Sequence, residues 1–232
     1  MPITTVGLDA DDTLWHNETL FRLTQDRFLD LLTDHDTEAV RARLAEVERR
    51  NLRLYGYGVK GFTLSMIETA MEMCDGEPPA GAIREILAAG REMLAHPVET
   101  LPGVDEALAR LSQRYRLVLV TKGDLLDQER KLAASGLGEL FAAVEIVSEK
   151  DRSTYDRVFA RHGTGAAEAV MAGNSMKSDV LPALEAGAFA VHIPYAITWA
   201  HELADAPDDH PRYGALDRIA DLPDWIDRRS DG

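Results

Sequence analysis

Three aspartates stand within four residues near the N-terminus, in the segment Leu8-Asp9-Ala10-Asp11-Asp12-Thr13. The preceding residues 3–8 are mostly apolar and predict a short buried strand, which should end at Asp9 because aspartate is a poor strand residue and is costly to bury. Open α/β sheets bind ligands at the carboxyl ends of parallel strands. Closely spaced carboxylates repel one another unless a cation lies between them, and such oxygen ligands suit Mg²⁺. The segment by itself predicts either a magnesium site or a solvated acidic turn.

Further polar side chains follow the later predicted strands, in this order along the chain: Thr121, Lys122, Lys150, Asn174 and Asp179. Parallel strands end at one edge of a sheet, so we expect these groups to converge with the aspartates. Each residue alone is weak evidence, because a lysine after a strand is usually solvated and a threonine there usually caps a helix. Their joint appearance at successive strand ends is specific.

The set suits phosphoryl transfer. A transferring phosphoryl group needs positive charge and donors around its oxygens, which a metal ion, Lys150 and Thr121 could supply. One carboxylate can attack phosphorus and form an aspartyl-phosphate. A second carboxylate, two residues further on, can protonate the leaving oxygen and later take a proton from water.

The elements that must position these groups alternate between strand and helix from residue 99 onward. About five strands in all predict a doubly wound, Rossmann-like parallel sheet of the α/β class. A parallel crossover needs only about a dozen residues, yet residues 15–98 separate the first strand from the next elements and carry four helical patterns without a convincing strand. We therefore predict an α/β core domain of residues 1–14 and 99–232 with an inserted helical cap at 15–98, well placed to cover the crevice.

Composition narrows the classes of partner. The 232 residues carry a formal net charge of −15, which argues against a nucleic-acid backbone or an anionic membrane as main partner. Cys74 is the single cysteine, so no intramolecular disulfide is possible. No signal peptide or membrane-spanning run is evident. We expect a cytoplasmic protein, either monomer or homodimer.

The ordered residues Asp9-x-Asp11-x-Thr13, Thr121, Lys150 and Gly173-Asn174-Ser175…Ser178-Asp179 resemble the four motifs of the haloacid dehalogenase-like (HAD) hydrolase superfamily. The entry to the core at Leu101-Pro102-Gly103-Val104 and a helical cap between the first and second motifs are also similar to that family. The resemblance covers nearly the whole chain. It implies a phosphatase-type member with an inserted cap.

The resemblance also implies catalytic roles. Asp9 would be the nucleophile and a Mg²⁺ ligand, and Asp11 the general acid/base, with its backbone carbonyl on the metal. Thr121 and Lys150 would hold the transferring phosphoryl group. Lys122 directly follows Thr121 and is a further candidate for substrate binding.

Asn174 and Asp179 would complete the metal site by the same resemblance, directly or through water. Two residues depart from the family pattern. Asp12 stands where the phosphatases most often have glycine, so a less permissive residue must make the turn. Asn174 stands where aspartate is common, which removes one negative charge from the metal site.

We therefore expect a Mg²⁺-dependent phosphohydrolase that acts on a small phosphorylated metabolite. A dehalogenase is disfavoured, because carbon–halogen displacement needs neither Asp11 nor a metal. A phosphomutase would use the same pair of aspartates and exclude water with its cap. A receiver-like phosphoacceptor would lack the second aspartate and the insertion, and a non-catalytic binding module has only Asn174 in its favour. The sequence does not identify the substrate.

Overall fold

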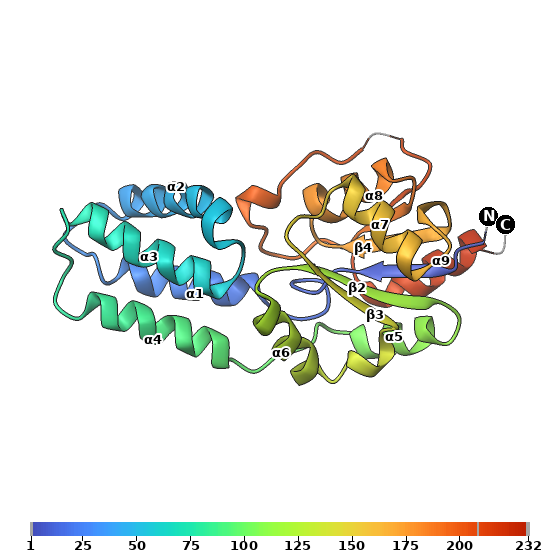
Figure 1. Ribbon diagram of the computed structural model, residues 1–232, viewed down its shortest axis with the longest axis horizontal. Helices are drawn as coiled ribbons and strands as arrows, with labels where there is room; N and C mark the ends of the chain where they lie inside the picture. The colour runs from blue at the N-terminus through green and yellow to red at the C-terminus, as the bar shows by residue number, and fades with distance from the viewer. Residues whose placement is uncertain (1, 208, 231–232) are drawn as a thin grey trace. The chain divides into compact units, whose positions relative to one another are not determined.

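The computed structural model describes residues 2–207 and 209–230. Within this part of the chain, six strands form one sheet in the order β3-β2-β1-β4-β5-β6 (Figure 1). All neighbouring strands pair in parallel. The strands are β1 (Thr5–Leu8), β2 (Arg116–Lys122), β3 (Ala143–Val147), β4 (Ala169–Gly173), β5 (Phe189–His192) and β6 (Tyr213–Ala215).

The predicted α/β class and parallel sheet are confirmed, with one strand more than predicted. The additional strand, β6, is three residues long and pairs with β5 at the edge of the sheet. So short a strand is difficult to predict, because three residues cannot establish an alternating pattern.

Alternate residues of the central strands face opposite sides of the sheet, as the period of a strand requires. Val6 of β1 and Leu119 of β2 belong to one apolar core, which they share with α5 (Val104–Ser112) and α9 (Leu222–Ser230). Val118 of β2 belongs to the other core, together with Phe159 of α7 (Arg152–His162) and Ala183 of α8 (Leu181–Glu185). Both faces are therefore covered by helices, as expected of a parallel sheet. The helices that follow β2, β3 and β4 are α6 (Leu125–Ser135), α7 (Arg152–His162) and α8 (Leu181–Glu185).

The chain divides into two compact units. The unit that contains the sheet runs to Glu18 and then includes 98–122 and the chain from Gln128 onward; the helical unit consists of 19–97 and 123–127. The helical unit is built from α1 (Glu18–Leu29), α2 (Thr37–Tyr55), α3 (Val59–Met73) and α4 (Ala82–Ala95). These helices pack around their own apolar cluster, which includes Phe28, Leu44 and Met66. No described helix is long and apolar enough to cross a membrane.

The C-terminal helix lies further along the chain than the sequence indicates. A weak helical pattern at 216–219 predicts a helix there, whereas α9 spans Leu222–Ser230. Pro223 fits the first turn of α9, where a backbone N–H has no helical partner. Trp225 and Ile226 are buried and anchor the helix against the sheet.

Candidate active site

Asp9 directly follows β1 and lies in a buried cluster of charged groups. Lys150 Nζ donates to Asp9 Oδ1, and it also donates to Asp179 Oδ1 at 2.7 Å. Thr13 Oγ1 donates to Asp9 Oδ2 at 3.1 Å. A Cβ on Gly173 would lie 2.2 Å from Asp179 Oδ2, so the glycine that ends β4 leaves the space that the Asp179 carboxylate occupies. The ends of three strands, β1, β3 and β4, thus contribute to one site, as the sequence predicted for a sheet edge.

Burial sets the electrostatics of this cluster. Burial raises the pKa of Asp9, Asp179 raises it further, and Lys150 acts in the opposite direction. Burial alone would lower the pKa of Lys150, but the two carboxylates outweigh it, so the pKa of this lysine is raised. Lys150 is therefore held as an ammonium between two carboxylates. One ammonium does not neutralise both of them, and an additional cation would be stabilised at this position.

The position of the Asn174 side chain bears on whether a cation fits beside Asp9 and Asp11. One terminal atom of its amide lies 3.1 Å from Asp9 Oδ2 and 3.2 Å from the backbone carbonyl oxygen of Asp11. With the amide nitrogen in this position, both oxygens accept a hydrogen bond. With the amide oxygen there, three oxygens converge, which is the type of donor set that Mg²⁺ prefers. Among the described residues no three His, Cys, Asp or Glu side chains form a metal cluster, so the candidate site depends on the amide and the carbonyl as well.

Asp11 lies beside this cluster, with its carboxylate surrounded by donors. Oδ1 accepts from Trp15 Nε1 at 2.7 Å and from Lys131 Nζ at 2.6 Å. Oδ2 accepts from Gln128 Nε2 at 3.0 Å. Gln128 and Lys131 come from α6 and were not among the residues predicted from the sequence. Their three-residue spacing places them on one helix face, but it does not show that this face meets Asp11.

Thr121 is connected to Asp11 through the same glutamine. Gln128 Nε2 lies 2.7 Å from Thr121 Oγ1 and 2.7 Å from the backbone carbonyl oxygen of Lys122. The Lys122 side chain has other partners: its Nζ donates to Ser178 Oγ at 2.9 Å and to Glu202 at 2.7 Å. Of the two lysines predicted to bind substrate, Lys150 therefore contacts Asp9, whereas Lys122 is paired with a glutamate.

Glu202 is a second residue that the sequence did not reveal. It lies in the segment after β5 and accepts from Ser175 Oγ at 2.5 Å and from Ser178 Oγ. Burial alone would raise the pKa of Glu202, but Lys122 and the two hydroxyl groups lower it to about 2. A single glutamate in an irregular segment carries no periodic signal, so only the fold could bring it to Lys122.

Asp12 makes the turn that follows Asp11. Its φ is 61°, in the left-handed region that aspartate tolerates better than most residues. Its carboxylate accepts from the backbone N–H groups of Asn17 at 2.9 Å and Glu18 at 3.0 Å, and so caps the start of α1. Burial raises the pKa of Asp12 to about 7. The capping bonds give this departure from the family pattern a structural role.

Comparison with known proteins agrees with this geometry. Residues 3–187 match the family described as haloacid dehalogenase-like hydrolase. The chain is 40% identical to a haloacid dehalogenase-like family hydrolase from Xanthomonas campestris, with a TM-score of 0.88 over 99% of this chain and 94% of that one. No curated protein matches by sequence.

Two more distant structures share the fold. The putative HAD-hydrolase YfnB from Bacillus subtilis, bound to magnesium, is 16% identical, with a TM-score of 0.68 over 97% of this chain and 99% of that one. An L-2-haloacid dehalogenase from Xanthobacter autotrophicus, with chloropropionic acid covalently bound, is 15% identical, with a TM-score of 0.66 over 97% and 98%. The sheet, the ordered residues at its strand ends and the match over 3–187 together make this chain an enzyme of the haloacid dehalogenase-like hydrolase family.

Proposed function

We propose that the chain is a cytoplasmic, Mg²⁺-dependent phosphohydrolase that acts on a small phosphomonoester through an aspartyl-phosphate on Asp9. The observation that carries the proposal is the second carboxylate, Asp11. It lies two residues from the nucleophile, and Gln128 connects it to Thr121. A phosphomonoester needs such a group, because its leaving oxygen must gain a proton.

In the first step, an Asp9 carboxylate oxygen attacks phosphorus, and the bond from phosphorus to the leaving oxygen breaks. The electron pair of that bond remains on the leaving oxygen, which takes a proton from the Asp11 carboxyl group. Lys150 and Thr121 hold the oxygens of the phosphoryl group as charge develops on them. The products are an alcohol and the aspartyl-phosphate.

In the second step, water attacks phosphorus and the bond from phosphorus to Asp9 breaks, which leaves Asp9 as a carboxylate. Asp11 takes the proton of the water and is ready to act as an acid again. Inorganic phosphate leaves with the oxygen of that water. Each step thus restores the protonation state that the other step requires.

Asp9, the Asp11 backbone carbonyl, Asn174 and Asp179 are the residues that would hold Mg²⁺. The ion would offset the negative charge of the phosphoryl group, which two buried carboxylates would otherwise repel. The convergence of oxygens around the Asn174 amide supports this assignment.

Dehalogenation is the main competing activity, since a dehalogenase shares the fold. A halide ion leaves without a proton, so that reaction has no use for a general acid beside the nucleophile. In this chain the Asp11 carboxylate has three donors that fix it at the site. This arrangement favours phosphate ester hydrolysis.

The test compares hydrolysis of an aryl phosphate and release of halide from a 2-haloacid, each with and without Mg²⁺. We expect metal-dependent phosphate release that falls at least about 10⁴-fold in Asp9→Asn and about 10²–10⁴-fold in Asp11→Asn. Asp156→Asn, an exposed aspartate on α7, serves as the matched control and should keep wild-type rates.

Halide release that survives Asp11→Asn would overturn the proposal in favour of a dehalogenase. A stable aspartyl-phosphate that transfers its phosphoryl group to a sugar phosphate but not to water would favour a mutase. Labelling of Asp9 by a small phosphodonor without turnover would favour a phosphoacceptor.

A further inference from the structure

The chain from Asn174 to Asp179 makes a tight turn that carries a candidate metal ligand at each end. Residues Met176–Val180 form a single turn of π-helix, a rare conformation that is found frequently at functional sites. The backbone N–H of Ser175 donates to Asp179 Oδ2 at 2.9 Å, and Lys150 Nζ donates to Asp179 Oδ1 at 2.7 Å. The position of the Asp179 carboxylate therefore depends on the conformation of this turn.

Two serine hydroxyl groups of the turn converge on a glutamate from a later part of the chain. Glu202 ends a short 3₁₀ turn that follows β5. One of its carboxylate oxygens, Oε2, accepts from Ser175 Oγ and from Ser178 Oγ. Ser175 directly follows one candidate ligand, and Ser178 directly precedes the other. Glu202 thus holds the chain neighbours of both candidate ligands.

The hydrogen bonds of these two hydroxyl groups have one consistent direction. A carboxylate has no hydrogen to donate, so each serine hydroxyl gives its single proton to Glu202. The hydroxyl oxygens then accept: Ser175 Oγ accepts from the backbone N–H of Ser178 at 2.9 Å, and Ser178 Oγ accepts from Lys122 Nζ at 2.9 Å. Both hydroxyl groups therefore depend on the carboxylate as their acceptor.

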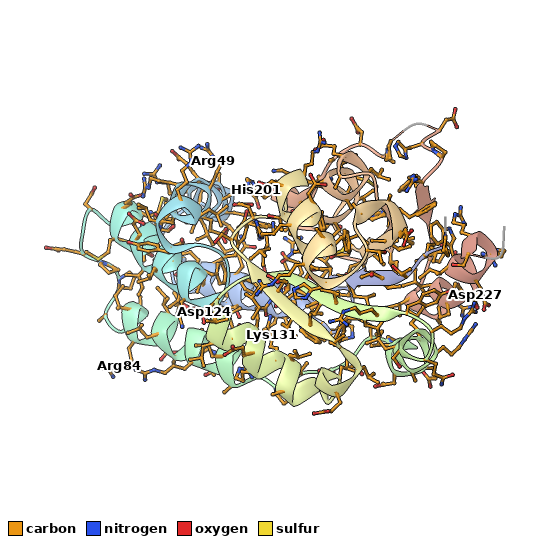
Figure 2. All side chains as sticks on the ribbon, turned by 45° about the vertical axis from the view of Figure 1, so that its right-hand side comes forward. Arg49, Arg84, Asp124, Lys131, His201 and Asp227 are labelled. Atoms are coloured by element: carbon orange, nitrogen blue, oxygen red, sulfur yellow. The ribbon has the colours of Figure 1, made fainter. Side chains whose placement is uncertain are left out.

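Lys122 balances the charge of this carboxylate. Its Nζ donates to Glu202 Oε1 at 2.7 Å, and the two side chains are 12% and 14% exposed. An ion pair so well shielded from water is favourable only where further hydrogen bonds satisfy it, and the two serines supply these bonds. From the same turn, Lys177 Nζ donates to the backbone carbonyl oxygen of His201 at 2.9 Å (His201 is labelled in Figure 2). The segment after β5 is therefore tied to the turn by several hydrogen bonds.

We propose that Glu202 is a positioning residue of the magnesium site, because its carboxylate holds the turn in the conformation that places Asn174 and Asp179. The proposal rests on the function proposed above, since it assigns Glu202 to the metal site which that function requires. Glu202 acts through the hydroxyl groups of Ser175 and Ser178. Without this anchor the turn has more freedom, and ordering it when Mg²⁺ binds costs affinity.

The experiment measures the dissociation constant of Mg²⁺ by isothermal titration calorimetry in the absence of substrate. Glu202→Gln keeps the size of the side chain but has one acceptor oxygen instead of two, so it cannot accept from both Lys122 and the serines. We expect the dissociation constant to rise at least about tenfold, the lower end of the range for groups that orient metal ligands. Circular dichroism establishes that the variant is folded.

Glu145→Gln is the matched control. Glu145 is 16% exposed and pairs with Arg161 and His162, so this variant loses a comparably shielded ion pair in the same unit. Its dissociation constant for Mg²⁺ should stay at the wild-type value. An equal rise in Glu145→Gln would show that loss of any such ion pair weakens the site, and an unchanged constant in folded Glu202→Gln would show that Glu202 has no role. Either result overturns the proposal.

Glu202→Gln also leaves the charge of Lys122 uncompensated, and this charge would repel Mg²⁺ by itself. The double variant Lys122→Met/Glu202→Gln removes both charges and so separates the two effects. If Glu202 acts by positioning the turn, the dissociation constant stays raised in the double variant. A return to the wild-type value would mean a purely electrostatic effect and would overturn the proposal.

Ser178→Ala changes no charge and decides the question if Glu202→Gln does not fold. It removes one of the two hydroxyl groups that Glu202 holds, so we expect the dissociation constant to rise about two- to tenfold, the equivalent of one hydrogen bond; an unchanged constant would contradict the proposal. If the wild-type chain binds no Mg²⁺, the function proposed above is itself wrong, and this result is known before any variant is measured. Wild-type binding that the variants leave unchanged refutes only the role of Glu202.

Discussion

One cluster of ion pairs from each unit shows how differently charged side chains are placed in this protein. In the helical unit, Arg27 pairs with Glu85 and Glu92, and these side chains are 43%, 49% and 64% exposed. In the unit that contains the sheet, Lys150 pairs with Asp9 and Asp179, and these side chains are 2%, 9% and 1% exposed. The first group lies in water and the second is almost completely removed from it.

The contrast distinguishes charged side chains that can be removed with little loss of stability from those that cannot. An exposed ion pair gains little, because water already solvates both partners and salt screens them. A buried ion pair gives up its hydration, and removing one partner leaves the other as an uncompensated buried charge. A fold has little stability to gain from burying such groups, so their presence at the strand ends is best explained by the chemistry they perform.

The largest expected effect on stability comes from Lys150→Met, which leaves Asp9 and Asp179 buried without an ammonium. We expect the free energy of unfolding at neutral pH to fall by about 3–5 kcal/mol. Urea denaturation followed by tryptophan fluorescence measures this, because Trp15, Trp199 and Trp225 all lie in the unit that contains the sheet. A loss no larger than that of an exposed pair would show that the buried cluster is not as strongly coupled as its geometry indicates.

Glu202→Gln tests the contribution of a buried charge to stability, because this contribution should depend on pH. The pKa of Glu202 is lowered to about 2, so its ionised form stabilises the fold above the unfolded pKa of about 4.5, and this contribution is lost as the pH falls toward 2. We expect the variant to be about 3 kcal/mol less stable than wild type at neutral pH, and the difference to shrink to about half near pH 3.

Urea denaturation at several pH values gives the difference in unfolding free energy directly. A difference that stays constant over this range would mean that the contact with Lys122, Ser175 and Ser178 depends on packing rather than on the charge of Glu202.

Arg27→Met should have the smallest effect. We expect a change in unfolding free energy of less than about 1 kcal/mol, which decreases further as salt is added. Far-ultraviolet circular dichroism follows the unfolding of the helices in this experiment. A loss comparable to that of Lys150→Met would remove the distinction between the exposed and the buried cluster.

Much of the fold could be predicted from the sequence, because its signals are local. Apolar runs such as 116–121 predict the parallel strands. Helical spacing over 82–95 and 125–135 predicts two helices, which the structure shows as α4 and α6. The sequence patterns were weaker where the strands or helices were short or irregular. The three-residue strand β6 was missed, and the last helix was placed too early in the chain.

The candidate site was predictable to the extent that its residues lie at or soon after the ends of strands. Asp9, Lys150 and Asp179 meet because parallel strands end at one edge. Lys122 satisfies the same rule, yet its ammonium pairs with Glu202. Position after a strand therefore predicts the region in which a side chain lies, but not its partner.

The class of fold, the order of the residues at the strand ends and the resemblance to the hydrolase family could all be inferred from the amino-acid sequence alone. The groups that surround Asp11 became apparent only in the folded chain. Gln128 and Lys131 are separated from it by 117 and 120 positions, and helical periodicity reports that a face is buried without reporting what it is buried against. Hydrogen bonds between such distant residues depend on how the elements pack, so they appear only when the chain is folded.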